Sequence, residues 1–307
     1  MGTAVTIGKF DGFHLGHKLL LDKIRTYAEE RNVKSICYKL DFGGAAILSP
    51  EEQEKLAAEA GIDEFIRVPF TPEFASSSPE DFVKNILIGE LGAEHIVVGT
   101  DFCFGKNREG NVELLKSLSD KYGFTVDAVE KLKLDGEVVS STGIRALLEE
   151  GDAAGAEKRL GRSYGFSGKV GSGKHLGRSL GFPTVNIVPG ESKLLPKFGV
   201  YASRTIVGDS IYGSITNVGI RPSVDDGDTA NVETFIYDFT NNSFSTMIHY
   251  PLYKVKGTDH IIGSFNFKFQ IIRQSRCRCH LFNSKSALNK IFNIIFCNLK
   301  TNCKFTI

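Results

Sequence analysis

Short apolar runs and longer amphipathic stretches alternate along the first half of the chain. The run Thr3 to Gly8 predicts a strand, and apolar residues then recur at helical spacing from Leu15 to Arg31. Alternating units of this size predict a parallel sheet covered by helices, with ligands at the carboxyl ends of the strands. Further strands are predicted at Ser35 to Leu40, Phe65 to Pro69, His95 to Gly99 and Thr125 to Glu130, and further helices at Pro50 to Ala60, Pro79 to Leu91, Asn111 to Tyr122, Thr142 to Glu150 and Asp152 to Leu160.

The pattern changes after Gly161, where turns rich in Gly, Pro and Asp join strand-like runs with no helical stretch between them. This pattern is typical of a small all-β barrel. The sequence therefore predicts an α/β domain over residues 1–161 and a β-barrel domain over residues 162–240. The predicted strands of the barrel are Tyr164 to Val170, Gly199 to Val207, Ser210 to Val218 and Asn231 to Phe239.

The formal charge of +1 hides an uneven distribution of charge. From Thr240 onward the sequence has ten basic residues and one acidic residue, Asp259. This basic tail also contains four of the six cysteines. Residues 241–307 do not show the strand pattern expected for the rest of a barrel. The simplest hypothesis for this change of composition is a shifted reading frame near residues 240–250. A nucleic-acid-binding extension would have the charge but has no motif to organise it. The run Cys277 to His280 lacks the second ligand pair of a zinc site.

The remaining composition favours a cytoplasmic protein. No signal peptide follows Met1, and no apolar run approaches the roughly 18 residues of a membrane span. The cysteines suggest no disulfide framework. We therefore expect small-molecule partners rather than a membrane or nucleic acid, and the sequence leaves the oligomeric state open.

A loop between the first strand and the first helix carries candidate chemistry. His14 and His17 lie three residues apart at the start of the helix, where free backbone N–H groups favour a phosphate. Gly16 lets a nucleotide approach the backbone closely. Such a site stabilises charge on a triphosphate without a covalent nucleophile. A lone histidine is more often a surface residue, but two histidines flanking a glycine directly after the first strand favour function.

A second candidate segment opens a late helix. Ser140, Ser141 and Thr142 supply three hydroxyls, and Arg145 follows one turn later. Helix capping explains one hydroxyl of this set. The alternative is a clamp for a leaving pyrophosphate, with Arg145 as a fixed cation.

These segments, together with Gly99 to Gly105, resemble the FMN adenylyltransferase module of bacterial bifunctional riboflavin kinase/FAD synthetases, of the nucleotidyltransferase superfamily. The resemblance implies a Rossmann-like domain that transfers AMP from ATP to FMN, with Mg²⁺, and releases pyrophosphate. It implies catalytic roles for His14 and His17. It implies nucleotide-binding roles for Gly8, Phe10, Asp11, Gly16, Asp101, Ser140, Ser141, Thr142 and Arg145.

The barrel carries its own candidate site. Gly168, Gly171 and Gly173 form a glycine-rich stretch able to wrap phosphates, although His175 replaces the hydroxyl of a true P-loop; a flexible hairpin loop is the alternative. Thr184 and Asn186 alternate onto one face and offer oxygens suited to Mg²⁺. Glu233 interrupts an otherwise apolar strand, as a rim carboxylate or a general base.

The stretches around these residues resemble the riboflavin kinase domain of the same bifunctional family. By that resemblance Thr184 and Asn186 bind Mg²⁺ and ATP, and Glu233 accepts the proton of the ribityl 5′-hydroxyl as it attacks the γ-phosphate. Members of that family continue with further strands and a C-terminal helix; without them the barrel would have an open edge and an incomplete wall of the flavin pocket. We therefore expect FAD to form from FMN more readily than FMN forms from riboflavin.

Two other functions stay open at this stage. A nucleotidyltransferase of another substrate class would share the histidine loop and the hydroxyl segment, but it would lack the second domain. A non-catalytic flavin- or nucleic-acid-binding protein would retain the motifs without turnover. Release of pyrophosphate in the presence of FMN separates the first hypothesis from both.

Overall fold

The structure is a computed structural model that describes residues 2–171, 184–187, 189–190, 192–221, 229–237 and 246–254. The chain divides into two compact units. The first unit comprises Met1–Ala146, Glu157–Arg162 and Glu191–Leu194, and the second comprises Leu147–Ala156, Ser163–Gly190 and Leu195–Ile307.

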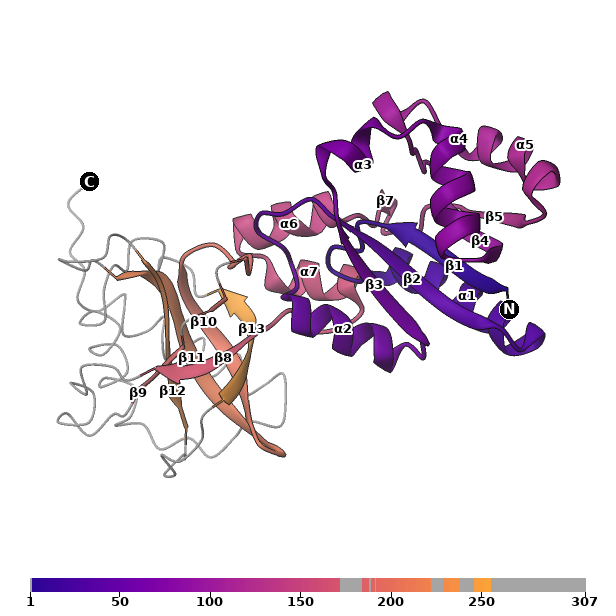
Figure 1. Cartoon of the computed structure of the whole chain (residues 1–307). Helices are drawn as coiled ribbons and strands as arrows, with labels where there is room; N and C mark the ends of the chain where they lie inside the picture. The colour runs from indigo at the N-terminus through magenta and orange to yellow at the C-terminus, as the bar shows by residue number, and fades with distance from the viewer. Residues whose placement is uncertain are drawn as a thin grey trace. The chain divides into compact units, whose positions relative to one another are not determined.

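A five-stranded parallel sheet in the order β3-β2-β1-β4-β5 forms the centre of the first unit (Figure 1). The central strand is apolar and almost completely buried, as expected for a strand covered on both faces. The strands are β1 (Thr3–Gly8), β2 (Lys34–Asp41), β3 (Glu64–Pro69), β4 (Ala93–Gly99) and β5 (Thr125–Val129).

Helices cover both faces of this sheet. Ala4 of β1 packs in the cluster that holds apolar residues of α1 (Leu15–Arg31) and α2 (Pro50–Glu59). Val5 and Ile7 alternate to the opposite face, where they pack with the π-helical segment η1 (Phe82–Glu90) and α5 (Val112–Tyr122). The smaller elements are α3 (Pro72–Ser76), α4 (Pro79–Asp81), the 3₁₀ turn η2 (Lys106–Arg108), the two-stranded pair β6 (Lys133–Leu134) and β7 (Glu137–Val138), α6 (Ser141–Glu150) and α7 (Ala153–Leu160).

The predicted alternation of strands and helices is confirmed, and so is the parallel sheet. The short elements α3, β6 and β7 were not predicted, because segments this short carry too few positions to show a period. Among the described helices, none is long and apolar enough to cross a membrane.

A short segment from the second half of the chain belongs to the first unit. Lys193 is buried, and its Nζ lies 2.5 Å from a carboxylate oxygen of Glu52 and donates to the carbonyl of Ile47 at 2.8 Å. The backbone N–H of Leu194 donates to the carbonyl of Ala46 at 2.7 Å. Segment 191–194 therefore adds backbone pairing and a buried cation to a loop that precedes α2.

The second unit contains a closed antiparallel barrel of six strands in the order β10-β11-β12-β9-β8-β13 (Figure 1). The barrel class predicted from the sequence is confirmed. Its strands are β8 (Phe166–Gly171), β9 (Thr184–Ile187), β10 (Gly199–Val207), β11 (Ser210–Arg221), β12 (Thr229–Ile236) and β13 (Thr246–Lys254).

The open edge expected from the sequence is wrong, because β13 closes the ring between β8 and β10. A proline within a strand-like run normally marks an edge or a bulge. Pro251 pairs with Ser203 directly after a register shift in β10, so the ladder accommodates it. The reading-frame hypothesis, which places a shift near residues 240–250, stays a prediction, and residues 238–245 and 255–307 lie outside the described residues.

The two faces of the barrel strands differ in how their polar groups are bonded. Ser203 contacts the hydroxyls of Ser214 and Thr216 at 2.7 Å each, and Thr216 contacts Thr234 at 2.9 Å. All four side chains are buried, whereas the neighbouring Arg204 is exposed. The hydroxyl ladder therefore faces into the barrel, and the alternate residues, which include the buried Asn217 and Glu233 as well as Arg204, lie on the other face of the strands.

Candidate active sites

The two histidines of the first loop lie against each other at the start of α1. Their rings stack with centroids 3.7 Å apart, and Nδ1 of His14 accepts a hydrogen bond of 3.2 Å from the backbone N–H of His17. His14 is thus the N-cap of α1. A Cβ at Gly16 would lie 3.2 Å from the His14 ring, so a side chain there would push the pair apart. The glycine thus spares the stacked pair a tight contact, and its predicted role toward a nucleotide stays a prediction.

Both histidines are neutral at pH 7. Burial lowers the pKa of His14 to about 4. Burial, and then the neighbouring His14, holds the pKa of His17 well below its usual range. Because Nδ1 of His14 is an acceptor, the proton of the neutral ring lies on Nε2. Nδ1 of His17 is enclosed, and no hydrogen-bond partner for it lies within the described part of the chain.

A cavity of about 590 Å³ joins this loop to segments that are distant in the sequence. A cavity of this volume is of the size that takes a nucleotide-sized ligand. Most of the residues of the first unit that were predicted to be catalytic or to bind a nucleotide line it. They are Gly8, Phe10, His14, Gly16, His17, Asp101, Ser140, Ser141 and Thr142.

Phe10 and Asp101 are placed by contacts with protein groups. The buried Phe10 has a positive φ of 44°, and its ring lies 4.9 Å from that of His17, so it supports the histidine from behind. Asp101 forms an ion pair of 2.7 Å with Lys131, which also lines the cavity. Both partners of this ion pair are exposed, so it contributes little to stability.

The cavity also has an aromatic wall that the sequence did not single out. Phe42 and Phe70 stack with centroids 4.3 Å apart, and the chain of ring contacts continues through Phe74 to Phe82. Phe42 is 49% exposed and Phe70 is 36% exposed, and Nζ of Lys9 lies 4.3 Å from the centroid of the Phe42 ring, so the pair is a partly exposed apolar surface beside a cation. The wall could not be found from the sequence, because its rings come from separate segments. The sequence signal was only the high number of phenylalanines, 23 in all.

The three hydroxyls at the start of α6 have different partners. Ser140 Oγ accepts from the N–H of Gly143 at 3.2 Å, which is the capping role, and Ser141 Oγ donates to the carbonyl of Asp11 at 2.7 Å. Thr142 is exposed at the cavity. Capping thus accounts for one of the three, and Thr142 is the hydroxyl best placed to meet a ligand.

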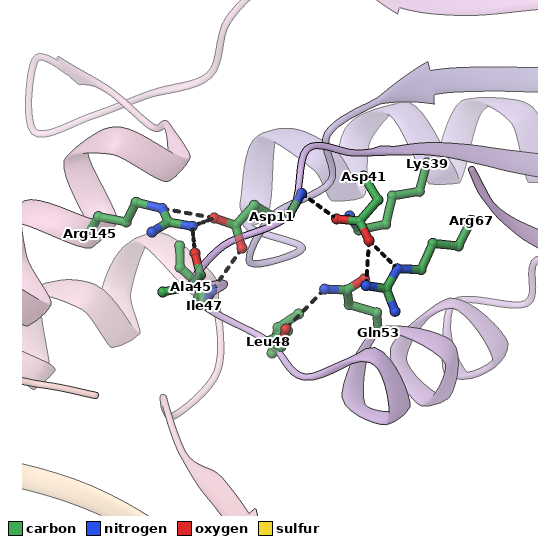
Figure 2. A network of polar contacts seen from close by, with 10 residues as sticks. Asp11, Lys39, Asp41, Ala45, Ile47, Leu48, Gln53, Arg67 and Arg145 are labelled. Atoms are coloured by element: carbon green, nitrogen blue, oxygen red, sulfur yellow. Dashed lines mark hydrogen bonds and ion pairs between the residues drawn. The ribbon is translucent and has the colours of Figure 1, made fainter. Parts of the chain in front are cut away.

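Arg145 and Asp11 do not line the cavity but form a brace between two segments (Figure 2). Arg145 Nε and Nη2 donate to Asp11 Oδ2 at 2.9 and 2.5 Å, and Nη2 also donates to the carbonyl of Ala45. The other oxygen of Asp11 accepts from the N–H of Ile47 at 2.8 Å. The guanidinium predicted to clamp pyrophosphate therefore holds the histidine loop to α6, and its role toward pyrophosphate stays a prediction.

A buried lysine beside this brace was missed by sequence analysis. Lys39 is 5% exposed and pairs in register with Gly8 at the end of β1. Burial lowers the pKa of Lys39, and Asp41, 3.8 Å away, opposes that shift. Asp41 in turn accepts from Arg67 at 2.7 Å (Figure 2). Charged residues are rare in buried strands, so this lysine inside an apolar run was the available signal.

The candidate residues of the barrel meet in one row across neighbouring strands. Glu233 on β12 faces Asn186 on β9 in the ladder, and Asn186 in turn faces Gly171 on β8. Glu233 is 4% exposed, and Asn186 is partly buried. The predicted carboxylate and amide are thus side by side. Thr184 lies two positions before Asn186 on β9, Gly168 lies on β8, and Gly173 lies outside the described residues.

Comparisons with known proteins agree with both halves of the chain. The family model described as FAD synthetase matches residues 1–143, and the one described as riboflavin kinase matches residues 160–257. The second match extends through β13, in agreement with the closed ring.

Curated relatives match most of the chain. A bifunctional riboflavin kinase/FMN adenylyltransferase of Pseudomonas fluorescens is 34% identical, covering 79% of this chain and 81% of its own. One from Haemophilus influenzae is 31% identical, with 92% and 95% covered. A crystal structure titled macrolide-efflux protein, from Streptococcus pneumoniae, shares the fold with a TM-score of 0.77, 24% identity, and 98% and 95% of the two chains covered. The family resemblance is confirmed, and the chain belongs to the family of bifunctional riboflavin kinase/FMN adenylyltransferases.

Proposed function

We propose that this chain makes FMN from riboflavin and ATP at its barrel, and FAD from FMN and ATP at its α/β unit. The observation that carries the proposal is the joining of the stacked histidines, the hydroxyls of α6 and the aromatic wall in one cavity. The second domain matches the riboflavin kinase family, which a nucleotidyltransferase of another class would lack. ATP, riboflavin and FMN are the substrates that fit this family.

In the α/β unit, a phosphate oxygen of FMN attacks the α-phosphorus of ATP, and the bond to the bridging oxygen breaks as pyrophosphate leaves. The neutral histidines offer N–H donors, and the first turn of α1 offers backbone N–H groups and the positive end of its dipole. These groups stabilise charge on the phosphates. The exposed stack of Phe42 on Phe70 suits the flat ring system of a flavin.

In the barrel, the terminal hydroxyl of riboflavin attacks the γ-phosphorus of ATP while Glu233 accepts its proton, and the bond to the leaving ADP breaks. Mg²⁺ would neutralise charge on the phosphate oxygens. The residues present fit that ion: Asn186 Oδ1 is enclosed, has no hydrogen-bond partner among the described residues, and is a hard oxygen ligand. Asn186 and Thr184 of β9 are the residues proposed to hold it.

The test is a time course with the intact chain, riboflavin, Mg²⁺ and ATP, in which FMN and FAD are separated by chromatography. We expect FMN to appear first, followed by FAD and pyrophosphate. A matched reaction started from FMN gives the second rate alone. FAD from neither substrate would contradict the proposal for the α/β unit, and no FMN from riboflavin would contradict it for the barrel.

The same time course tests whether FAD forms from FMN more readily than FMN forms from riboflavin. That expectation came from an open barrel edge and an incomplete wall of the flavin pocket, and β13 removes the first reason within the described strands. A slower kinase step would then point to residues 255–307, and equal rates would remove the expectation.

A further inference from the structure

The row that contains Glu233 continues to a third polar residue that the proposed mechanism does not use. In the ladder of β11 and β12, Asn217 is the partner of Glu233, just as Asn186 is its partner on β9. Directly opposed residues have Cβ atoms roughly 4.5–5.5 Å apart. Glu233 therefore has an amide side chain on each side.

Asn217 is buried in a way that needs an explanation. It is 4% exposed, and its Oδ1 has no hydrogen-bond partner among the residues that the structure describes. Leaving a buried amide oxygen without a partner costs about 1–3 kcal/mol, so few such groups persist in a native fold without a reason. The inward-facing hydroxyls of Thr216 and Thr234, one residue away on the same two strands, bond to each other instead.

The order of the row suggests what this oxygen binds. Asn186 lies on one side of Glu233 and is the proposed contact to the metal and phosphates, so the phosphoryl group arrives from that side. The reacting hydroxyl lies at Glu233, and the rest of the substrate must extend past it. An amide oxygen is an acceptor, and it requires a donor such as a second hydroxyl.

We infer that Asn217 Oδ1 accepts a hydrogen bond from the hydroxyl on the carbon next to the one being phosphorylated. This inference rests on the proposed kinase function and makes Asn217 a specificity residue for substrates that end in two adjacent hydroxyls. The ribityl chain of riboflavin has that chemistry. Glu233 and Asn217 together select a vicinal diol, because a site built to bond a hydroxyl rejects an analogue that lacks it.

The experiment compares riboflavin with an analogue that lacks only the hydroxyl next to the terminal one. The intact wild-type chain should phosphorylate riboflavin with a kcat/KM at least about tenfold higher. Asn217→Ala should lower kcat/KM for riboflavin by the same factor and leave the analogue unchanged, so that the two substrates become equal. Such a loss of discrimination is a coupling that a general loosening of the barrel would not produce.

Two further variants complete the test. Thr216→Val removes the adjacent buried hydroxyl on the opposite face, and it should keep the preference for riboflavin even if the chain is less stable. Asn217→Asp keeps the size and an acceptor oxygen, so it serves if the alanine variant does not fold. It should retain the preference for riboflavin, because a carboxylate oxygen also accepts a hydrogen bond from a hydroxyl.

The outcomes are distinguishable. Equal loss of kcat/KM for both substrates in Asn217→Ala would show a structural role and overturn the inference. Equal kcat/KM values of the wild-type chain for riboflavin and the analogue would overturn the inference as well. A wild-type chain that makes no FMN at all would overturn the proposed kinase function itself.

Discussion

The two candidate sites differ in how far the protein satisfies its own polar groups. In the α/β unit Asp11, Arg145, Ser140 and Ser141 all bond to protein atoms, and His17 Nδ1 is the exception, with no partner among the described residues. In the barrel the amide oxygens of Asn186 and Asn217 have no partner among the described residues. Most polar groups of the first site are thus bonded to one another around a cavity, whereas the second site contains amide oxygens that can accept hydrogen bonds from a ligand.

The difference predicts which mutations should lower both stability and activity and which should lower activity alone. Removing a member of the brace breaks contacts that exist before substrate binds, so stability and activity should fall together. Replacing one of these two amide side chains in the barrel removes the cost of burying an oxygen without a hydrogen bond. Activity should therefore fall, while the free energy of unfolding stays the same or rises.

The largest effect is expected for Glu233→Gln. The change preserves size and removes the proton acceptor, and general-base catalysis is worth about 10²–10⁴-fold, so FMN formation should fall by that range. Formation of FAD from FMN should continue at the wild-type rate. Parallel loss of both activities would show that the two sites are not separable.

His17→Ala should produce the reverse pattern. Loss of a group that stabilises developing charge costs about 10²–10³-fold, so the rate of FAD formation from FMN should fall by this range. The partly exposed ring contributes less to the core than to the cavity wall, so the kinase rate should persist. Pyrophosphate release and chromatography measure the two steps independently, and an unchanged rate of FAD formation would remove His17 from the mechanism.

Acid should destabilise the first unit through His14. Its pKa is about 4 in the folded chain against 6.5 ordinarily, so the unfolded state binds the proton first as pH falls. Stability is therefore constant above about pH 6.5, falls between 6.5 and 4, and loses at most about 3 kcal/mol. Urea unfolding at several pH values measures this slope. His14→Asn keeps an N-cap and should make the slope shallower without removing it, because the lowered pKa of His17 contributes in the same direction. An equally steep slope would assign the effect to groups other than His14.

The smallest effect concerns the brace. Asp11→Ala and Arg145→Ala should each lower the free energy of unfolding by about 1 kcal/mol, discounted because Arg145 is about a third exposed. Since the two side chains bond each other, the double variant should cost less than the sum of the single ones. Additive losses would mean that the pair is not energetically coupled. An intact adenylylation rate in Arg145→Ala would exclude it as a phosphate clamp.

Sequence patterns gave the local features of these sites more fully than the long-range ones. The histidine loop could be predicted because His14, Gly16 and His17 are within four residues and their spacing is that of a helix start. The partner of Arg145 could not, because Asp11 is 134 residues away and only the folded sheet joins them.

Strand register explains why two features of the barrel were not predicted from the sequence. Glu233 was visible as a charge in an apolar strand, but no sequence period states which residue of β11 faces it, so Asn217 was not singled out. The closing strand β13 was missed for a similar reason: its pairing with β8 and β10 links residues far apart in the chain, and its proline weakens the strand pattern.

Segment 191–194 has a consequence for how this protein can be divided. The chain leaves β9, contributes Lys193 and Leu194 to the fold of the first unit, and only then enters β10. A fragment ending at residue 161 would contain every strand of the parallel sheet but lack the cation beside Glu52 and the backbone that pairs with Ala46. The first unit is therefore discontinuous in the sequence. A fragment meant to contain the adenylylating unit alone would need residues 191–194 added to it.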